Sequence, residues 1–431
     1  MKITIGETTY TALKSLFYTP GTDVTGATVA INEFEVDIMT ADDISIGQYA
    51  YLYDDLDALW AKYWIVFAEH IDKFTTKVKA QSTLALLERI TLPPVMYSGD
   101  SVTSVLADLF DPLGSGAYTI DNSFSGLTLT GFCPEQDAKT RLQWICFTIS
   151  AYVKSFFSET IDILPVDSQT ETLIPLDKHF WKPTVTYKEY VTAVNIKGYS
   201  FTQGTPSATD EWVTDGTNYY IMTTRTFTLT NPDAPAAAPT QEITIDGITL
   251  VNSSNVSGIL SYLSSYYFKR EEAEIDVINN GEYLPGERVI AYTDEDALCV
   301  GFINSAEFTF GVQARSRLVI TPIDVKEAAR ITLIYKYGSL QIGSEVYYFP
   351  VGYSYSIDLP YIDIKVSEHR YIFRPTIAAV TGTVPEGGDT VEVDYAVALD
   401  YRPVSGVRTL YIESVDEVEQ DQSETERVEI E

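Results

Sequence analysis

The stretch NEFEVDI at residues 32–38 alternates two kinds of side chain. Phe34, Val36 and Ile38 share one set of alternate positions with Asn32, and the three residues between them are acidic. A period of two is that of a β-strand, whose successive side chains point to opposite faces. The stretch therefore predicts a half-buried strand with one face in a core and an acidic outer face.

The same alternation recurs along most of the chain and predicts a mainly β fold. Turn signals such as Asp215-Gly216, Asn280-Gly281 and Pro285-Gly286 separate the strand-like segments. The stretch NPDAPAAAPT at 231–240 predicts a loop or linker. The other predicted strands are 48–53, 63–68, 184–196, 219–229, 242–251, 287–292, 331–337, 345–357, 390–397 and, near the C-terminus, 406–412.

Helical patterns are few and short. Apolar residues recur at helical spacing in 101–110, 138–153 and 256–270, and a shorter helix is predicted at 83–90. The expected N-caps are Asp100 for the first and Asn255 for the third, and Asp111-Pro112 should end the first. Each apolar stripe is interpreted as core packing. The fold class predicted is therefore mainly β with a few short helices (α+β).

The composition argues against several classes of protein. The chain has 431 residues, with 61 Asp and Glu against 29 Lys and Arg, a formal net charge of −32. A protein that binds free nucleic acid or an anionic membrane surface needs a basic face. No apolar run approaches the roughly 18 residues of a spanning helix, and the first residues, MKITIGETTY, contain no secretory h-region. Three scattered cysteines predict free thiols in a reducing cytoplasm.

No catalytic, metal-binding or cofactor-binding residue is predicted, and the protein is expected not to be an enzyme. His70, His179 and His369 lack a second His at ligand spacing, and each is interpreted as a structural residue. The Walker A, dinucleotide-binding and Gly-x-Ser-x-Gly patterns are absent. Acidic groups in turns are interpreted as solvated, although a glycosidase pair of carboxylates stays open. These groups are Asp42-Asp43, Asp54-Asp55, Glu271-Glu272 and Asp294-Glu295-Asp296.

Two distant segments resemble each other. GQYAYLY at 47–53 is followed by Phe67 and by VKAQS at 78–82, and GERVIAY at 286–292 is followed by Phe302 and by VQARS at 312–316. Each predicts a turn followed by three strands, and the pair indicates a duplicated β-domain. The alternative is that two unrelated antiparallel meanders share these features. Two copies per chain, in a trimer, would adapt a three-fold object to a six-fold one.

Two further stretches carry a family resemblance: RLQWICFTISAYV at 141–153, and YLSSYYFKRE at 262–271 followed by PGERV at 285–289. With the order of elements around them, the chain resembles the baseplate hub and tail-tip hub proteins of tailed phages and of phage-derived tail particles of Gram-positive bacteria, which are relatives of the central hub of T4-type baseplates. The resemblance covers about residues 1–320. Glu287 departs from the Asp expected after the glycine and leaves the turn intact.

This resemblance implies a homotrimer with two β-barrel-like tube domains per chain. Such hubs form a ring that continues the tail tube, connect it to the spike or tip protein, and leave a channel for tape measure protein and DNA. The implied partners are the chain itself, the tail tube protein, the spike or tail-tip protein, the tape measure protein and other baseplate proteins. Specific nucleic acid binding and membrane insertion are not implied. The implied location is the virion tail, after synthesis in the host cytoplasm.

The domain map that follows has five parts. They are a first tube-like β domain at 1–95, a small α/β domain at 96–180, a second tube-like β domain with a hairpin or loop insertion at 181–320, a C-terminal β module at 321–412, and an acidic tail at 413–431.

Two alternatives stay open at the level of function. The C-terminal region looks like small β modules of bacterial surface adhesins, such as mucin-binding repeats, so a surface adhesin or glycan-binding β protein is the alternative to a hub. The acidity has two readings as well. Acids of the duplicated domains would line the channel and repel DNA over a Debye length, or the charge keeps the chain soluble before assembly.

Overall fold

The chain is mostly strand, with four short α-helices among the described residues, so the predicted fold class is confirmed. It divides into two compact units, one made of residues 1–293 and 299–324, the other of 294–298 and 325–431. The computed structural model describes residues 2–19, 28–53, 59–114, 116–155, 158–166, 171–180, 183–279, 281–294, 297–310, 315–337, 340–366, 369–400, 408–412 and 426–430.

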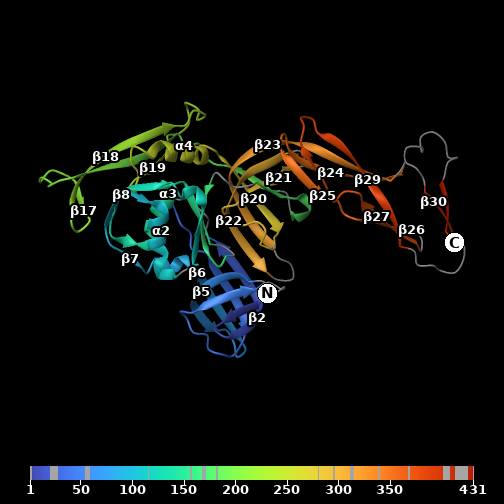
Figure 1. Cartoon of the computed structure of the whole chain (residues 1–431), viewed down its shortest axis with the longest axis horizontal. Helices are drawn as coiled ribbons and strands as arrows, with labels where there is room; N and C mark the ends of the chain where they lie inside the picture. Colours follow the sequence, from blue (N-terminus) through green and yellow to red (C-terminus); the bar gives the residue numbers. More distant parts are fainter. Residues whose placement is uncertain are drawn as a thin grey trace. The chain divides into compact units, whose positions relative to one another are not determined.

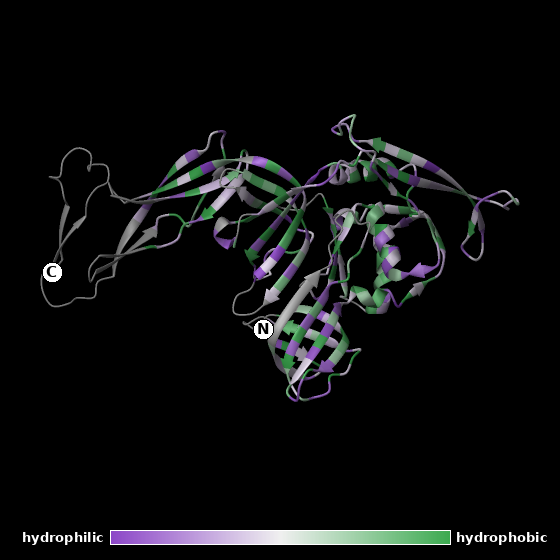
Figure 2. Cartoon of the chain, turned by 180° about the vertical axis from the view of Figure 1, so that it is seen from behind, coloured by the Kyte–Doolittle hydropathy of each residue, from purple (hydrophilic) through white to green (hydrophobic). Residues whose placement is uncertain are grey.

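Six strands of the first unit form a closed barrel, here called barrel 1. Its cyclic order is β1-β4-β5-β6-β3-β2, and β1 pairs with β2 to close it. Phe34, Val36 and Ile38 are at most 1% exposed, whereas the acids that alternate with them are exposed or partly exposed, as predicted. Hydrophobic and hydrophilic residues alternate along the strands of this barrel (Figure 2). Each such buried side chain contributes about 1.5–3 kcal/mol. The strands are β1 (Lys2–Ile5), β2 (Thr8–Thr19), β3 (Glu33–Met39), β4 (Tyr49–Tyr53), β5 (Leu59–His70) and β6 (Thr75–Ser82).

A second barrel, barrel 2, has the equivalent strand order β14-β21-β22-β23-β20-β15, except that β14 is parallel to β21 whereas β1 is antiparallel to β4. One segment closes it: β14 pairs with β21, His179 bridges Val277 on β20, and β15 continues along β20. The strands are β14 (Thr172–Ile174), β15 (Thr184–Tyr187), β20 (Glu271–Ile278), β21 (Arg288–Asp294), β22 (Ala297–Phe310) and β23 (Arg315–Tyr337), with the 3₁₀ turn η4 (Leu176–Lys178) between β14 and β15.

The two barrels are joined by a strand pair. Ser15–Thr19 of β2 lie antiparallel to Ala306–Phe310 of β22, so one sheet runs through both barrels. Their inward side chains form a single hydrophobic cluster that extends from Ile3 to Ile323.

A small α/β layer follows barrel 1 (Figure 1). The helices α1 (Leu84–Leu87), α2 (Val102–Phe110) and α3 (Ala138–Thr148) pack around a core that includes Leu106, Leu142 and Ile145. Three small sheets complete it. Their strands are β7 (Thr91–Leu92) with β11 (Gln136–Asp137), β8 (Val95–Ser101) with β10 (Thr128–Cys133), and β9 (Tyr118–Ile120) with β12 (Ala151–Lys154) and β13 (Ile161–Pro165); the 3₁₀ turns are η1 (Asp111–Leu113) and η2 (Asn122–Phe124).

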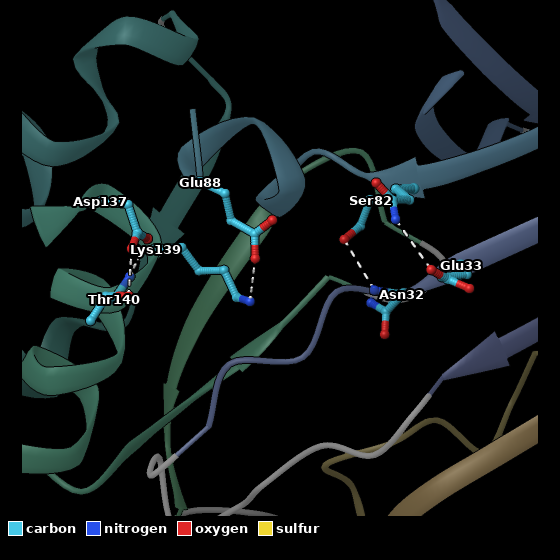
Figure 3. Close-up of polar contacts among 8 residues, drawn as sticks. Asn32, Glu33, Ser82, Glu88, Asp137, Lys139 and Thr140 are labelled. Carbon is cyan, nitrogen blue, oxygen red and sulfur yellow. Dashed lines mark hydrogen bonds and ion pairs between the residues drawn. The ribbon is translucent and has the colours of Figure 1, made fainter. Parts of the chain in front are cut away.

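Polar contacts lie within this layer and at the end of barrel 1 where β3 begins and β6 ends (Figure 3). Lys139 of α3 donates to Glu88 after α1 at 2.8 Å, and the Asp137 carboxylate caps α3 by accepting from Thr140 N at 2.8 Å. The backbone N–H of Asn32 donates to the Ser82 hydroxyl at 3.3 Å, where β3 begins and β6 ends. These bonds satisfy helix-end and strand-end groups that would otherwise be buried without partners.

The hairpin layer lies between β15 and β20 in the chain. β16 (Ala193–Gln203), β17 (Trp212–Thr214), β18 (Tyr219–Thr230) and β19 (Glu242–Ile245) form a sheet in the order β17-β18-β16-β19. The helix α4 (Val256–Tyr267) covers its inner end through Val256, Ile259 and Leu263. The predicted loop at 231–240 separates β18 from β19.

Several predicted boundaries are wrong. The helix predicted at 138–153 ends at Thr148, because Ser150 adopts a positive φ of 54° and the chain turns into β12. The strand predicted at 184–196 is two strands, since Lys188 N donates to Arg270 O at 2.8 Å and the chain leaves β20. Glycines with positive φ end two other strands early, Gly247 in 242–251 and Gly352 in 345–357.

The predicted helix caps also need correction. The N-cap of α2 is Ser101, not Asp100, whose carboxylate instead accepts from Ser98 N at 2.7 Å. Asn255 does occupy the N-cap of α4, but its side chain makes no capping bond and accepts from Asn252 N. The first helix ends before Asp111-Pro112, as predicted.

The second unit is built from the end of β23 and the strands after it. β24 (Leu340–Pro350) and β29 (Asp389–Asp400) flank β23, and buried Ile331, Leu333 and Phe349 contribute to its core. The other strands are β25 (Ser354–Asp358), β26 (Ile362–Val366), β27 (His369–Pro375), β28 (Ala379–Thr383), β30 (Arg408–Ile412) and β31 (Glu426–Ile430). Within the predicted acidic tail, residues 413–425 and 431 lie outside the described residues, and β31 pairs with β30.

Candidate assembly surfaces

The two histidines whose side chains the structure describes occupy different settings. His70 Nε2 lies 3.1 Å from Asp43 Oδ1, and its Nδ1 lies 2.8 Å from the Thr76 hydroxyl, at one end of barrel 1. His179 lies beside barrel 2, where burial lowers its pKa below the usual value. The side chain of His369 and the acids Asp54, Asp55, Glu295 and Asp296 lie outside the described part.

Reactive or metal-binding groups do not converge among the described residues. No three His, Cys, Asp or Glu side chains there could hold a metal ion. Burial raises the pKa of the Cys133, Cys146 and Cys299 thiols to about 12, so all three are protonated at neutral pH. None of the described helices is long and apolar enough to cross a bilayer.

The two barrels share a turn with the same hydrogen bonds. In barrel 1, Gly47 N donates to Ile65 O and Ile65 N donates to Gln48 O, each at 2.9 Å. Barrel 2 repeats both bonds at 2.7 and 2.9 Å, with Gly286 N donating to Ile303 O and Ile303 N donating to Glu287 O. Gly47 and Gly286 also share a positive φ, of 80° and 89°. The echo found in the sequence is therefore a structural repeat.

The repeat extends to the strand before each turn. Glu33, Glu35 and Asp37 alternate on β3, and Glu272, Glu274 and Asp276 alternate on β20, with Gly47 and Gly286 each twelve positions after the middle acid. Sequence reasoning missed this match, although the spacing E-x-E-x-D before each turn would have shown it.

The predicted alignment after the turn is wrong. The residue equivalent to Ile303 is Ile65, so Phe67 does not correspond to Phe302. Lys77 corresponds to Arg317, because both lie opposite the third acid of the series and bind the middle one. A bulge after Ile65 shifts this register in β5, and in β22 the next buried residue after Ile303 likewise follows three positions later. Residues 312–314 lie outside the described residues.

Several of the acids on these outer faces form ion pairs within the chain. Glu35 binds Lys77 and Lys79, each at 2.8 Å, and these contacts lower the pKa of Glu35. On barrel 2, Arg317 binds Glu274 and Arg315 binds Asp276. Because both ladders combine opposite charges, these outer faces are much less negative than their acids alone would make them.

The surroundings of the two turns differ. Ser45, Ile46 and Gly47 are exposed, whereas the equivalent Leu284, Pro285 and Gly286 are buried. The α/β layer covers the second turn: the Tyr152 ring lies on Gly286, and Lys154 donates to Glu287 at 2.7 Å. Barrel 1 therefore exposes a surface that barrel 2 has covered.

Two strand edges have no partner among the described residues. β5 pairs with β4 only up to Ile65, so Phe67–His70 pair with β6 on one side alone. β15 pairs with β20 on one side alone. An unpaired edge carries free N–H and C=O groups and is a ready template for another strand.

Two smaller features complete the surface. A cavity of about 160 Å³ between barrel 1 and the α/β layer is lined by Tyr49, Lys62, Glu159 and Thr160, among others, and Lys62 Nζ lies 4.0 Å from the Tyr49 ring centroid. The outer end of the hairpin layer exposes Trp212 and Tyr219, whose ring centroids are 5.2 Å apart. No catalytic arrangement accompanies either feature in the described part of the chain.

No protein-family model and no curated protein matches the sequence. Among solved structures, the tail protein from Neisseria meningitidis MC58 is 11% identical, with a TM-score of 0.54, and the match covers 74% of this chain and 95% of that one. The 43 kDa tail protein of prophage MuSo2 from Shewanella oneidensis is 10% identical, with a TM-score of 0.50 over 74% and 97% of the two chains. Prophage tail protein gp18 from Listeria monocytogenes EGD-e is 12% identical, with a TM-score of 0.48 over 74% and 94%. From the first two matches, the chain has the fold of phage tail proteins.

Proposed function

We propose that this chain is a structural hub protein of a phage tail or phage-derived particle. Three copies form a ring that continues the tail tube and connects it to the spike or tip protein. The ring leaves a channel for the tape measure protein and DNA. It works through assembly geometry and not through catalysis, in the tail of the virion.

The observation that carries this proposal is the structural repeat of the two barrels. Both have the same strand order, the same hydrogen-bonded turn and the same outer ion pair, with Glu35 and Lys77 matching Glu274 and Arg317. A ring of three such chains presents six similar barrels around one axis. It can therefore join a six-fold tube on one side to a three-fold spike on the other.

We propose further that the channel is acidic and does not hold DNA. The net charge of −32 per chain supports this, because phosphates are repelled over about one Debye length, roughly 8–10 Å. The acids of β3 and β20 contribute little, since Lys and Arg neighbours pair with them. A neutral or basic lumen in an imaged ring would overturn this part and leave the ring itself standing.

The experiment is the mass and shape of the purified chain. Light scattering should give three times the 48.0 kDa of one chain, and electron microscopy should show a three-fold ring with an open pore. The ring should bind the end of purified tail tubes in the same images. A chain that stays monomeric at high concentration and in the presence of tubes would contradict the proposal.

A further inference from the structure

We infer that the ring, if the proposed function holds, is closed by strand pairing between copies: β15 of one copy adds to the open edge of β5 in the next. The occupant of each open edge is therefore a second copy of this chain. The contact would be a backbone ladder, and each copy would give one strand edge and accept another.

The pairing inside one chain provides the template. Ser15–Thr19 of β2, in barrel 1, pair with Ala306–Phe310 of β22, in barrel 2, with Tyr18 opposite Glu307. The equivalent strands are the two with open edges. Leu16 lies opposite Glu35 and Thr184 lies opposite Glu274, so β15 occupies in barrel 2 the place of β2 in barrel 1.

The long strands correspond in the same way. Starting from Ile65 and Ile303, the sequences read IVFAEH and INSAEF, so Ala68 and Glu69 match Ala306 and Glu307. Both strands place a bulge after the isoleucine, because the next inward residue follows three positions later in each. The segment of β5 equivalent to the paired part of β22 is therefore the segment whose edge is open.

Equivalent residues of β22 and β5 differ in exposure, as expected if the open edge of β5 lacks a neighbouring strand. Ala306 and Phe308 are at most 1% exposed next to β2, whereas Ala68 is only half-buried and the His70 side chain is 41% exposed. Large apolar residues are exposed on both open strands or next to them. Tyr187 on β15 is 66% exposed, and Ile71 beside β5 is 52% exposed. An added strand would cover this apolar surface and satisfy the free backbone groups.

The template also fixes the register. Thr186 is the β15 residue equivalent to Tyr18, and Glu69 is the β5 residue equivalent to Glu307. The register of the pair Tyr18–Glu307 therefore places Thr186 of one copy opposite Glu69 of the next, and Thr184 opposite Ile71. No like charges face each other in this register. Because the donating and accepting edges are different strands, the contact is head-to-tail and must close into a ring or extend as a filament.

Disulfide trapping tests the pairing. The variant Thr186→Cys with Glu69→Cys places two thiols on directly opposite residues, whose Cα atoms in an antiparallel pair are about 4.5–5.5 Å apart and within disulfide reach. The native cysteines are all buried and give little background. The matched control is Thr184→Cys with Glu69→Cys, displaced by two residues or about 7 Å along the strand. Both single variants control for random oxidation.

The expected result is a shift on a non-reducing gel. The Thr186/Glu69 double variant should move from one-chain mass to covalently linked chains ending at three, while the displaced pair and the single variants stay at one-chain mass. Light scattering of the reduced proteins separates the two proposals. Trimers without a specific Thr186–Glu69 cross-link would overturn the pairing and leave the hub standing. If the reduced protein is monomeric, the proposed function and the pairing fail together.

Discussion

Gly286 lies directly under the aromatic ring of Tyr152. A Cβ built on Gly286 would lie 2.9 Å from Tyr152 Cδ2 and closer still to Cε2, nearer than real Cβ atoms approach other atoms. The equivalent Gly47 has the same left-handed backbone, but its nearest neighbour is Trp64 Cζ2 at 3.8 Å. The two glycines therefore share a backbone requirement, and only Gly286 has a packing requirement as well.

This difference predicts unequal costs for the same substitution. Gly47→Ala should lower the free energy of unfolding by about 1–2 kcal/mol through its positive φ alone. Gly286→Ala should cost about 1–3 kcal/mol more, because the Tyr152 ring must move. Urea unfolding of both variants measures the difference. Equal losses would show that Tyr152 is not held against the turn.

Arg141 predicts a second large effect. The residue is 5% exposed. Its Nη2 donates to the carbonyls of Leu92, Pro93 and Pro134 at 3.4, 2.7 and 3.0 Å, respectively. Arg141→Met would leave these carbonyls without that donor and should cost about 2–4 kcal/mol. Arg141→Lys keeps one ammonium donor, so its stability should lie between those of the wild type and Arg141→Met. Thermal unfolding of the three proteins gives the ranking, and an unchanged Arg141→Met variant would contradict it.

His179 predicts a pH dependence. Burial lowers its pKa in the folded chain below 6.5, so near that pH the unfolded chain binds a proton that the folded chain does not. The stability that comes from neutral His179 is complete above about pH 6.5 and is lost as the pH falls from there through the lower folded pKa. The difference in unfolding free energy between the wild type and His179→Gln should therefore change between pH 7.5 and 5.5. The difference should stay constant from pH 7.5 to 8.5. A difference that is also constant down to pH 5.5 would refute the lowered pKa of His179.

Glu35 predicts a pH dependence of the same sign in a more acidic range. Its pKa is lowered chiefly by hydrogen bonds from Lys77 and then Lys79, so its contribution to stability is present above the unfolded pKa and is lost as the pH falls through the folded one. Because the pair is partly solvated, Glu35→Gln should cost under about 1 kcal/mol at pH 7. The cost should shrink in 1 M NaCl and disappear in acid. A cost that is independent of salt would indicate packing and not charge.

Local pattern predicted several of the elements, although strands such as β2 and β20 were not predicted. Alternation around Phe34 predicted β3, and helical spacing predicted α2 and α4 within a few residues. The echo between the turns at Gly47 and Gly286 predicted the repeat itself. These features depend on neighbours within a few residues, which the sequence displays directly.

Long-range pairing was not predictable in the same way. Nothing in β2 marks Phe17 as the partner of Phe308, and nothing in 184–196 shows that the chain leaves β20 after Tyr187. The α3 boundary failed because Ile149 and Val153 continue the apolar spacing, while the positive φ of Ser150 turns the chain out of the helix. Tertiary packing decides such points over local propensity.

The strand β2 pairs with strands of both barrels, and this has a consequence for folding during synthesis. Residues 15–19 leave the ribosome early, but their partners on β22, residues 306–310, follow only after the α/β layer and the hairpin layer have been made. At about 5–20 residues per second, that edge waits roughly 15–60 s for its partner. The edge of β2 at residues 15–19 therefore stays without its β22 partner for most of translation, although the six strands of barrel 1 have all been made. The last third of the nascent chain completes a strand pair that the first twenty residues began.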